Sequence, residues 1–244
     1  MTLQVHRSPE DLAAALAQHV VGAITTKPNL TLGLPAGRTP ILLYAEIVAA
    51  SRAARLDWSR VRTFNLDEFV TPGGSEPQPF RQFMHDQLLS MVAVPPAHVD
   101  WPNGRAADLA AECDRYEGAI ASAGGLDLVL LGIGANGHIG FNEPGSAVNA
   151  RTHVAQLARA SLAANAWLFG HQIDRVPAQA ITMGIATILD ARSIVLVATG
   201  TEKATAVAAM INGAITSAVP ASFLQLHPDV TVLLDEAAGR LLLR

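Results

Sequence analysis

The chain has 244 residues, of which half are hydrophobic, with a net charge of −4 and one cysteine. This length allows one large α/β domain or two small ones, and the apolar content is enough for a sizeable core. The acidic balance argues against nucleic acid as a partner, because nucleic-acid-binding domains usually present a basic face. No apolar run reaches the roughly 18 residues of a membrane span, and charged residues occur too early for a signal peptide. Because a single cysteine cannot form a disulfide within the chain, we expect a cytoplasmic protein.

The first predicted elements are a helix, a strand and a second helix. Ser8 is suited to cap a helix, and apolar residues follow at helical spacing from Leu12 to Ile24. An apolar strand over residues 30–34 leads into the loop Ala36-Gly37-Arg38-Thr39, and a helix then begins at Pro40. This layout presents free backbone N–H groups to an anion, and the guanidinium in the loop suits phosphate. An ordinary strand-to-helix turn with an exposed arginine explains the loop equally well.

Two adjacent acids follow the next predicted strand, which covers residues 61–66. Asp67 and Glu68 stand at its carboxyl end. They could act as metal ligands, as a general base, or as the cap of the next element, and capping is the commonest outcome for these residue types. Helical spacing then returns over residues 80–92 and 109–121.

The most informative stretch is an apolar strand from Leu128, followed by a glycine-rich loop that ends at Gly145. Its glycines allow positive φ and close approach of the backbone to a ligand. In an α/β sheet, the loop after a strand's carboxyl end is where ligands bind. The spacing G-x-G-x-x-G also occurs here, but Pro144 soon interrupts any long helix, so a dinucleotide site is not indicated.

Polar residues in this loop form a candidate acid–base group. His138 leads it, because an unperturbed imidazole titrates near neutrality. Glu143 could orient the ring or stabilise its charge, and Asn136 is close in sequence. The alternative is a histidine held by backbone groups in a tight loop, but the glycines and the two polar neighbours favour a site.

The C-terminal half continues to alternate between strands and helices. Its predicted elements are a weak strand over 151–157, an alanine-rich helix over 158–169 that ends at Gly170, and strands over 193–198 and 231–234.

The alternation as a whole predicts a Rossmann-like α/β fold, with a mostly parallel sheet covered by helices on both faces. We expect a single domain over residues 1–244, with the loops at the strand ends meeting at one edge of the sheet. Lys203 begins a helix after Gly200, where a cation opposes the helix dipole unless an anion lies nearby. A solvated surface lysine explains that position equally well.

Together these motifs resemble the glucosamine-6-phosphate deaminase family, which shares a fold with the 6-phosphogluconolactonases. The resemblance covers nearly the whole chain, and the run Asn-Gly-His-Ile-Gly-Phe-Asn-Glu-Pro at 136–144 is specific to the deaminase branch. The matching runs are Leu34–Pro40, Thr63–Phe69, Gly132–Pro144, Thr182–Ile185, Gly200–Lys203 and Leu224–Pro228.

The resemblance implies that a 2-amino-2-deoxyhexose 6-phosphate is opened, isomerised from aldose to ketose and hydrolysed. Glucosamine 6-phosphate would yield fructose 6-phosphate and ammonia, without a metal or an organic cofactor. His138, with Glu143 and Asn136, would move the proton in ring opening, and Asp67 would take the proton from C2. The loop 36–39 and Lys203 would bind the phosphate and so fix the orientation that this chemistry needs.

Several positions depart from the family's usual pattern, among them the run at 76–80, where members usually show His-Pro-x-Ser-Tyr. Asn136 stands where many members have aspartate, although other deaminases of the family also carry asparagine there. Trp167 falls in a lid segment near residues 158–175, where members usually place a phosphate-binding arginine. Arg38 replaces a small residue, so we hypothesise that it supplies, from the other side of the phosphate, the cation that position 167 lacks. A second hypothesis is that Trp167 stacks on a different sugar, such as another epimer.

Other functions stay open on the sequence alone. A 6-phosphogluconolactonase needs no base at C2, and a non-catalytic sugar-phosphate sensor should have lost its acid–base residues, so Asp67, His138 and Glu143 favour the deaminase. The chain ends soon after Leu243, earlier than the long allosteric hexamers of the family. We therefore expect an unregulated monomer or small homo-oligomer that acts on a small-molecule sugar phosphate, with no nucleic-acid or membrane partner.

Overall fold

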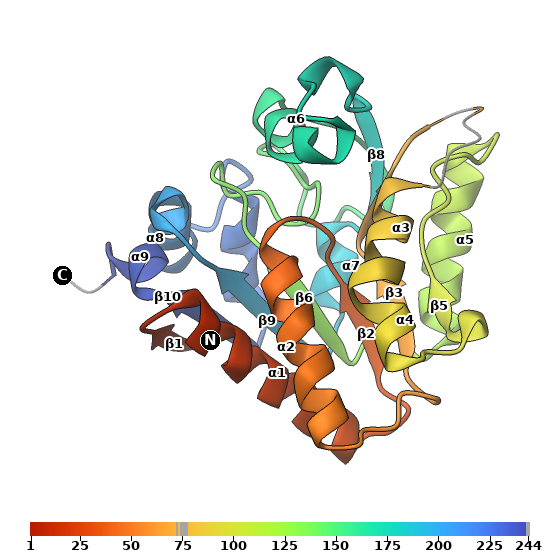
Figure 1. The fold of residues 1–244 in the computed structure, drawn as a ribbon. Helices are drawn as coiled ribbons and strands as arrows, with labels where there is room; N and C mark the ends of the chain where they lie inside the picture. The colour runs from red at the N-terminus through yellow and green to blue at the C-terminus, as the bar shows by residue number, and fades with distance from the viewer. Residues whose placement is uncertain (72, 74–77, 243–244) are drawn as a thin grey trace.

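A computed structural model describes residues 1–71, 73 and 78–242. Its main sheet is parallel, with seven strands in the order β1-β10-β9-β6-β2-β3-β5 (Figure 1). These strands are β1 (Thr2–His6), β2 (Thr31–Leu34), β3 (Arg62–Asn65), β5 (Val99–Asp100), β6 (Leu128–Gly132), β9 (Ser193–Ala198) and β10 (Val230–Asp235). The mostly parallel sheet predicted from the sequence is therefore confirmed.

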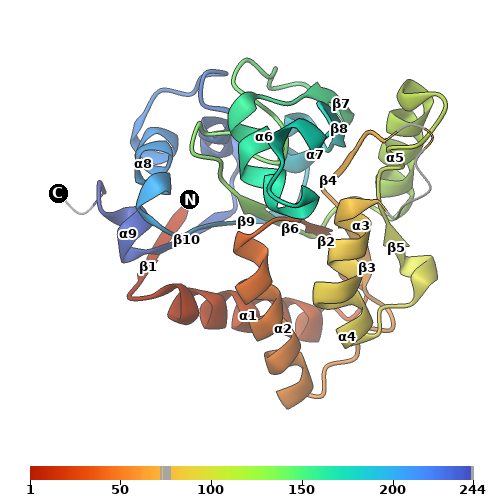
Figure 2. The same cartoon turned by 45° about the horizontal axis from the view of Figure 1, so that its top comes forward.

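Helices cover both faces of this sheet, as predicted (Figure 2). One face carries α1 (Pro9–Thr26), α2 (Thr39–Ala53), and α3 (Pro79–Met84), which continues through a π-helical turn (His85–Leu89) into α4 (Ser90–Val92). The other face carries α5 (Leu109–Ser122), α7 (Ile185–Leu189), α8 (Ala204–Asn212) and α9 (Glu236–Gly239). Short 3₁₀ helices cover Pro96–His98, Ala166–Phe169, Ile173–Arg175, Thr201–Lys203 and Pro220–Leu226. No helix among the described residues is long and apolar enough to cross a membrane.

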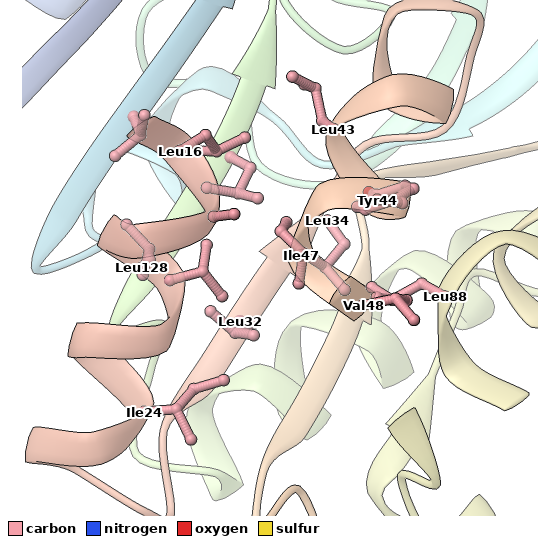
Figure 3. Packing of buried hydrophobic residues seen from close by; sticks show 14 of the residues in the cluster. Leu16, Ile24, Leu32, Leu34, Leu43, Tyr44, Ile47, Val48, Leu88 and Leu128 are labelled. Atoms are coloured by element: carbon pink, nitrogen blue, oxygen red, sulfur yellow. The ribbon is translucent and has the colours of Figure 1, made fainter. Parts of the chain in front are cut away.

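The two faces hold two separate cores because strand side chains alternate between them. Along β6, Leu128 and Leu130 point into the core under α1 and α2, whereas Val129 and Leu131 point into the core under α5 and α8. Figure 3 shows the first core, where side chains of α1, α2 and β2 meet. A strand buried on both faces is apolar throughout, and this is the pattern that marked β6 in the sequence.

The first helix has the predicted cap and core face. The Ser8 side chain accepts a hydrogen bond from the Asp11 N–H at 3.1 Å, and the predicted apolar stripe is buried. Gly170 also ends its helical segment as predicted, with a φ of +67°. That segment is α6 (Arg159–Asn165), followed by the 3₁₀ turn that contains Trp167.

A second, antiparallel sheet was not predicted. It has the order β4-β8-β7, with β4 (Asp67–Phe69), β8 (Gln179–Thr182) and β7 (His153–Gln156). The chain passes from one sheet to the other at Leu66. Its N–H donates to Leu34 O at 3.0 Å on β2, and its carbonyl accepts from Met183 N at 2.7 Å after β8. The predicted strand 61–66 therefore ends at Asn65, and Asp67 begins a strand of the other sheet.

Candidate active site

A cavity of about 340 Å³ opens at the carboxyl ends of β2, β6 and β9. Its walls come from the loop after β2, the chain at Leu66 and Asp67, the loop after β6, the turn after β9, and α6. It brings together most of the residues that the sequence singled out, namely Ala36, Gly37, Arg38, Thr39, Asp67, Asn136, His138 and Lys203. Glu143 lies behind His138 rather than in the wall, and Trp167 does not line the cavity.

The loop after β6 is shaped to seat the His138 ring. A Cβ built at Gly134 would lie 2.3 Å from the ring atoms Nδ1 and Cε1, so only glycine leaves space for the imidazole. The Gly134 N–H donates to His138 O at 2.9 Å, which closes the turn. Gly137 has a φ of +85°, and a Cβ there would meet the Val219 side chain at 2.8 Å. These glycines therefore fix the orientation of the histidine.

The end of this loop is anchored to the second sheet. The Phe141 N–H donates to Thr182 Oγ1 at 3.0 Å, and the Asn142 amide donates to the Ile139 and Met183 carbonyls at 2.9 Å each. Asn142 is fully buried. The antiparallel sheet thus holds the loop against the chain segment that carries Asp67.

A hydrogen-bond network joins His138, Asn136 and Glu143. Asn136 Oδ1 lies 2.7 Å from His138 Nδ1, and Asn136 Nδ2 donates to Glu143 Oε2 at 2.9 Å. Glu143 Oε2 lies 3.6 Å from the same ring nitrogen. Burial raises the pKa of Glu143, but hydrogen bonds from His138, Ser161 and Asn136 outweigh it and lower this pKa to about 2. Glu143 is therefore an anion at neutral pH.

The adjacent acids Asp67 and Glu68 lie in different surroundings. Glu68 is fully buried and accepts the backbone N–H groups of Phe69, Phe80 and Arg81 at 2.9, 3.2 and 2.8 Å, so it caps the start of α3. Asp67 is 6% exposed and lines the cavity, and no described residue donates a hydrogen bond to its carboxylate. The capping role considered for this pair thus belongs to Glu68.

Burial sets the protonation of both carboxyls. Burial, with a smaller contribution from the Glu68 charge, raises the pKa of Asp67 from 3.8 to about 8. Burial also raises the pKa of Glu68 to about 7, against the lowering effect of its three N–H donors. A carboxyl with its pKa near neutrality is a strong base once it is ionised, and one aimed into a cavity is a functional-site candidate.

Two cations also line the cavity. Arg38 stands at the N-terminus of α2, whose first turn receives no side-chain cap, and Lys203 projects from the turn after β9. Neither cation has a carboxylate within ion-pair distance among the residues that the structure describes. Burial lowers the pKa of Lys203, and Glu202 partly offsets that effect. An anion between these two side chains would satisfy both of them and the helix terminus.

Trp167 does not line the cavity. Its ring lies edge-on against Phe83, at 6.1 Å between centroids, and packs against the core under α2, so this geometry gives no support to the hypothesis that it stacks on a sugar. The side of α6 that does line the cavity presents Ala160, Ala164 and Asn165.

Sequence reasoning also missed Ser161, which lies on α6 and contacts Glu143. A serine within an alanine-rich helix gives no signal of its own in a sequence. Only the fold shows that this helix lies over the loop after β6.

This arrangement defines an α/β protein whose cavity is lined by a buried carboxyl group, a histidine and two cations. The family described as glucosamine-6-phosphate isomerases/6-phosphogluconolactonase matches residues 6–233. The chain belongs to this family.

Individual relatives agree with this assignment. The chain is 43% identical to the glucosamine-6-phosphate deaminase of Shewanella loihica, over 98% of this chain and 89% of the relative. It is also 43% identical to glucosamine-6-phosphate deaminase 2 of Bacillus subtilis, over 98% and 97%. The solved structure of a monomeric glucosamine-6-phosphate deaminase superposes with a TM-score of 0.94 at 40% identity, over 99% and 100% of the two chains. The 6-phosphogluconolactonase of Trypanosoma brucei shares the fold, with a TM-score of 0.76 at 24% identity over 99% and 98%.

Proposed function

We propose that this protein is a glucosamine-6-phosphate deaminase, which converts glucosamine 6-phosphate and water to fructose 6-phosphate and ammonia. One observation carries the proposal: Asp67 and His138 line the same cavity as the two cations Arg38 and Lys203. The chain's extensive similarity to deaminases supports the same activity.

The proposal gives each group a role. With the phosphate held between Arg38 and Lys203, the sugar extends toward the loop after β6. His138 transfers the proton that opens the pyranose ring, and Glu143 and Asn136 orient it. Asp67, as a carboxylate, takes the proton from C2 of the open aldose and returns it to C1. The resulting C2 imine adds water and releases ammonia, so the atoms balance without an oxidant.

The orientation of the histidine follows from its neighbours. Nδ1 faces the acceptors Asn136 Oδ1 and Glu143 Oε2, so Nδ1 carries the proton of the neutral ring. Nε2 is then the atom that exchanges a proton with the substrate. The second nitrogen of a functional histidine is commonly fixed in this way.

Two alternatives are less well supported. A lactonase hydrolyses an ester and needs no base at C2, whereas here a buried carboxylate faces the cavity. A sugar-phosphate sensor would not require the acid–base residues that the cavity retains. A panel of amino-sugar phosphates identifies the epimer that the enzyme prefers.

Ammonia release tests the proposal. Wild-type protein should release ammonia from glucosamine 6-phosphate faster than from galactosamine 6-phosphate or unphosphorylated glucosamine. Asp67→Asn should reduce kcat by about 10²–10⁴-fold, the usual contribution of a general base. Asp114→Asn, on the exposed side of α5, should leave the rate unchanged. Folded wild-type protein that releases no ammonia from any of these sugars would refute the function.

We also propose that the protein acts in the cytoplasm as a monomer, with the segment near residues 158–175 as a lid over the cavity. The similar solved structure of a monomeric deaminase supports the oligomeric state. Two cavity-lining alanines on α6 support the lid.

A further inference from the structure

The segment Ala158–Phe169, called here the α6 segment, touches both the cavity and the acid–base group. Ala160 and Ala164, one helical turn apart, line the cavity. Ser161 lies one position further round the helix, is fully buried, and donates its hydroxyl proton to Glu143 Oε1. One short helix therefore connects the space where the sugar would lie to the carboxylate behind His138.

The two oxygens of Glu143 are held by different parts of the chain. Oε1 accepts the Ser161 hydroxyl and the Ala158 N–H, the latter at 3.1 Å, so the α6 segment holds this oxygen. Oε2 accepts from Asn136 Nδ2 at 2.9 Å and faces His138 Nδ1 at 3.6 Å, so the loop after β6 holds the other. Loss of the α6 contacts would leave the carboxylate free to rotate against the histidine.

Donors and acceptors in this group are fixed by the bonds to Glu143. Asn136 uses its amide N–H on Glu143, so its Oδ1 accepts from His138 Nδ1. Ser161 Oγ, which lies 3.4 Å from the same nitrogen, uses its own proton on Glu143. His138 is the only titratable side chain within ion-pair distance of Glu143 in the described chain. The serine thus touches both members of the pair.

A buried serine hydroxyl needs a partner, and a role in helix packing alone would be served by a backbone carbonyl one turn back. Ser161 instead reaches a carboxylate 18 residues away on another element. Its own carbonyl accepts from Asn165 Nδ2 at 2.9 Å, and Asn165 lines the cavity. The contact therefore joins elements that each take part in forming the site.

We propose that Ser161 is a positioning residue, through which the docked α6 segment holds the Glu143 carboxylate in line so that His138 presents Nε2 to the sugar. The kinetic part of this inference rests on the proposed function. The structural part concerns the state of Glu143 and His138 in the free protein, and it stands independently of any activity.

NMR of the free protein tests the structural part. In Ser161→Ala, the carboxyl ¹³C titration of Glu143 should shift upward by about one pKa unit, because a hydrogen bond to the charged form is lost. The ¹⁵N shifts of His138 should move from one dominant Nδ1–H tautomer toward a mixture. Ser146→Ala is the matched control, because its hydroxyl donates to the backbone carbonyl of Glu143 at 2.7 Å and not to the carboxylate. If neither signal changes in Ser161→Ala, the inference is wrong.

Kinetics test the second part. Ser161→Ala should lower kcat about 5–20-fold with a KM change below about threefold, because orientation and not binding is lost. Ser161→Thr, which keeps the hydroxyl, should restore most of kcat. A raised KM with unchanged kcat would show a purely structural role and overturn the proposal. If wild-type protein releases no ammonia, the proposed function fails, while the NMR result still decides the inference. Ser161→Cys, a weaker donor of similar size, provides the same NMR readings if the alanine variant does not fold.

Discussion

Asp67 and Glu68 show how neighbouring residues of one charge acquire different roles. Glu68 accepts three backbone N–H bonds, two of them from the start of α3, and Asp67 is left to face the cavity. A buried carboxyl without donors is costly to ionise, so Asp67 is kept largely protonated until the pH approaches 8. The same burial that makes it a strong base should therefore reduce stability.

The sign of this effect follows from the two pKa values. Between pH 3.8 and about 8, Asp67 is ionised in the unfolded chain but protonated in the folded one, so the unfolded state binds fewer protons. The stability contributed by this group is thus greatest below pH 4 and falls as the pH rises through this window. Asn in its place carries no such dependence.

We therefore expect Asp67→Asn to be more stable than wild type by roughly 2–4 kcal/mol at pH 8, with the difference shrinking toward pH 5. Urea unfolding at pH 5, 6.5 and 8 measures this difference. The exposed Asp114→Asn should show no such trend. A stability difference that does not change with pH would contradict the assignment of Asp67 as a buried, high-pKa base.

At this scale the sequence predicted residue types better than residue partners. His138 stood out because glycines surrounded it, and the reason is steric, since Gly134 makes room for the ring. Two adjacent acidic residues in a sequence do not show which one caps a helix and which one faces a cavity, so the different roles of Asp67 and Glu68 could not be predicted. The role of Ser161 could not be predicted because its partner Glu143 is distant in sequence. The packing of Trp167 could not be predicted because its contact with Phe83 is tertiary.

The clearest functional element is α2 with the loop before it. The helix spans 15 residues and starts at Thr39 without a side-chain cap. Pro40 has no N–H and the Ile41 N–H donates to Arg38 O at 3.2 Å, so the Thr39 N–H and the helix dipole are what this terminus offers an anion. Gly37 has a φ of +127°, which favours glycine at the turn. Arg38 adds a full positive charge where the helix contributes only a partial one.

Arg38→Ala should raise KM for glucosamine 6-phosphate about 10–100-fold and leave kcat within about twofold, because a charge-assisted phosphate contact is lost. Its weak turnover of unphosphorylated glucosamine should not change. Arg52→Ala removes the same charge from the exposed last turn of α2 and should change neither KM nor kcat. An unchanged KM in Arg38→Ala would refute the hypothesis that this residue supplies the missing phosphate cation.

Helices and strands could be predicted where the capping and turn residues agreed with the apolar periodicity. The caps and apolar stripe of α1 and the buried β6 have strong local patterns. The second sheet lacked one, because its pairing joins Asp67 to Thr182 and no local pattern encodes that register. The edge strand β1 was missed because most of its residues are exposed and its polar and apolar residues mix.

At the scale of the whole molecule, the described residues form three apolar clusters, which raises the question of whether these are separable units. The first two are opposite faces of one sheet and share its strands. The third gathers Phe69, Phe80 and Phe141 under the α6 segment. Two residues tie it to the first, since Ala36 packs against both clusters and Trp167 extends from the α6 segment into the core under α2.

We propose on this basis that the chain is a single cooperative domain. Its thermal unfolding should give one calorimetric transition, with equal calorimetric and van't Hoff enthalpies of about 170 kcal/mol, from roughly 0.7 kcal/mol per residue over 244 residues. For a monomer the Tm should also be independent of protein concentration over a hundredfold range. Scans at several rates separate equilibrium unfolding from irreversible loss. Two transitions would show that the third cluster unfolds separately, and a Tm that rises with concentration would show that subunits associate.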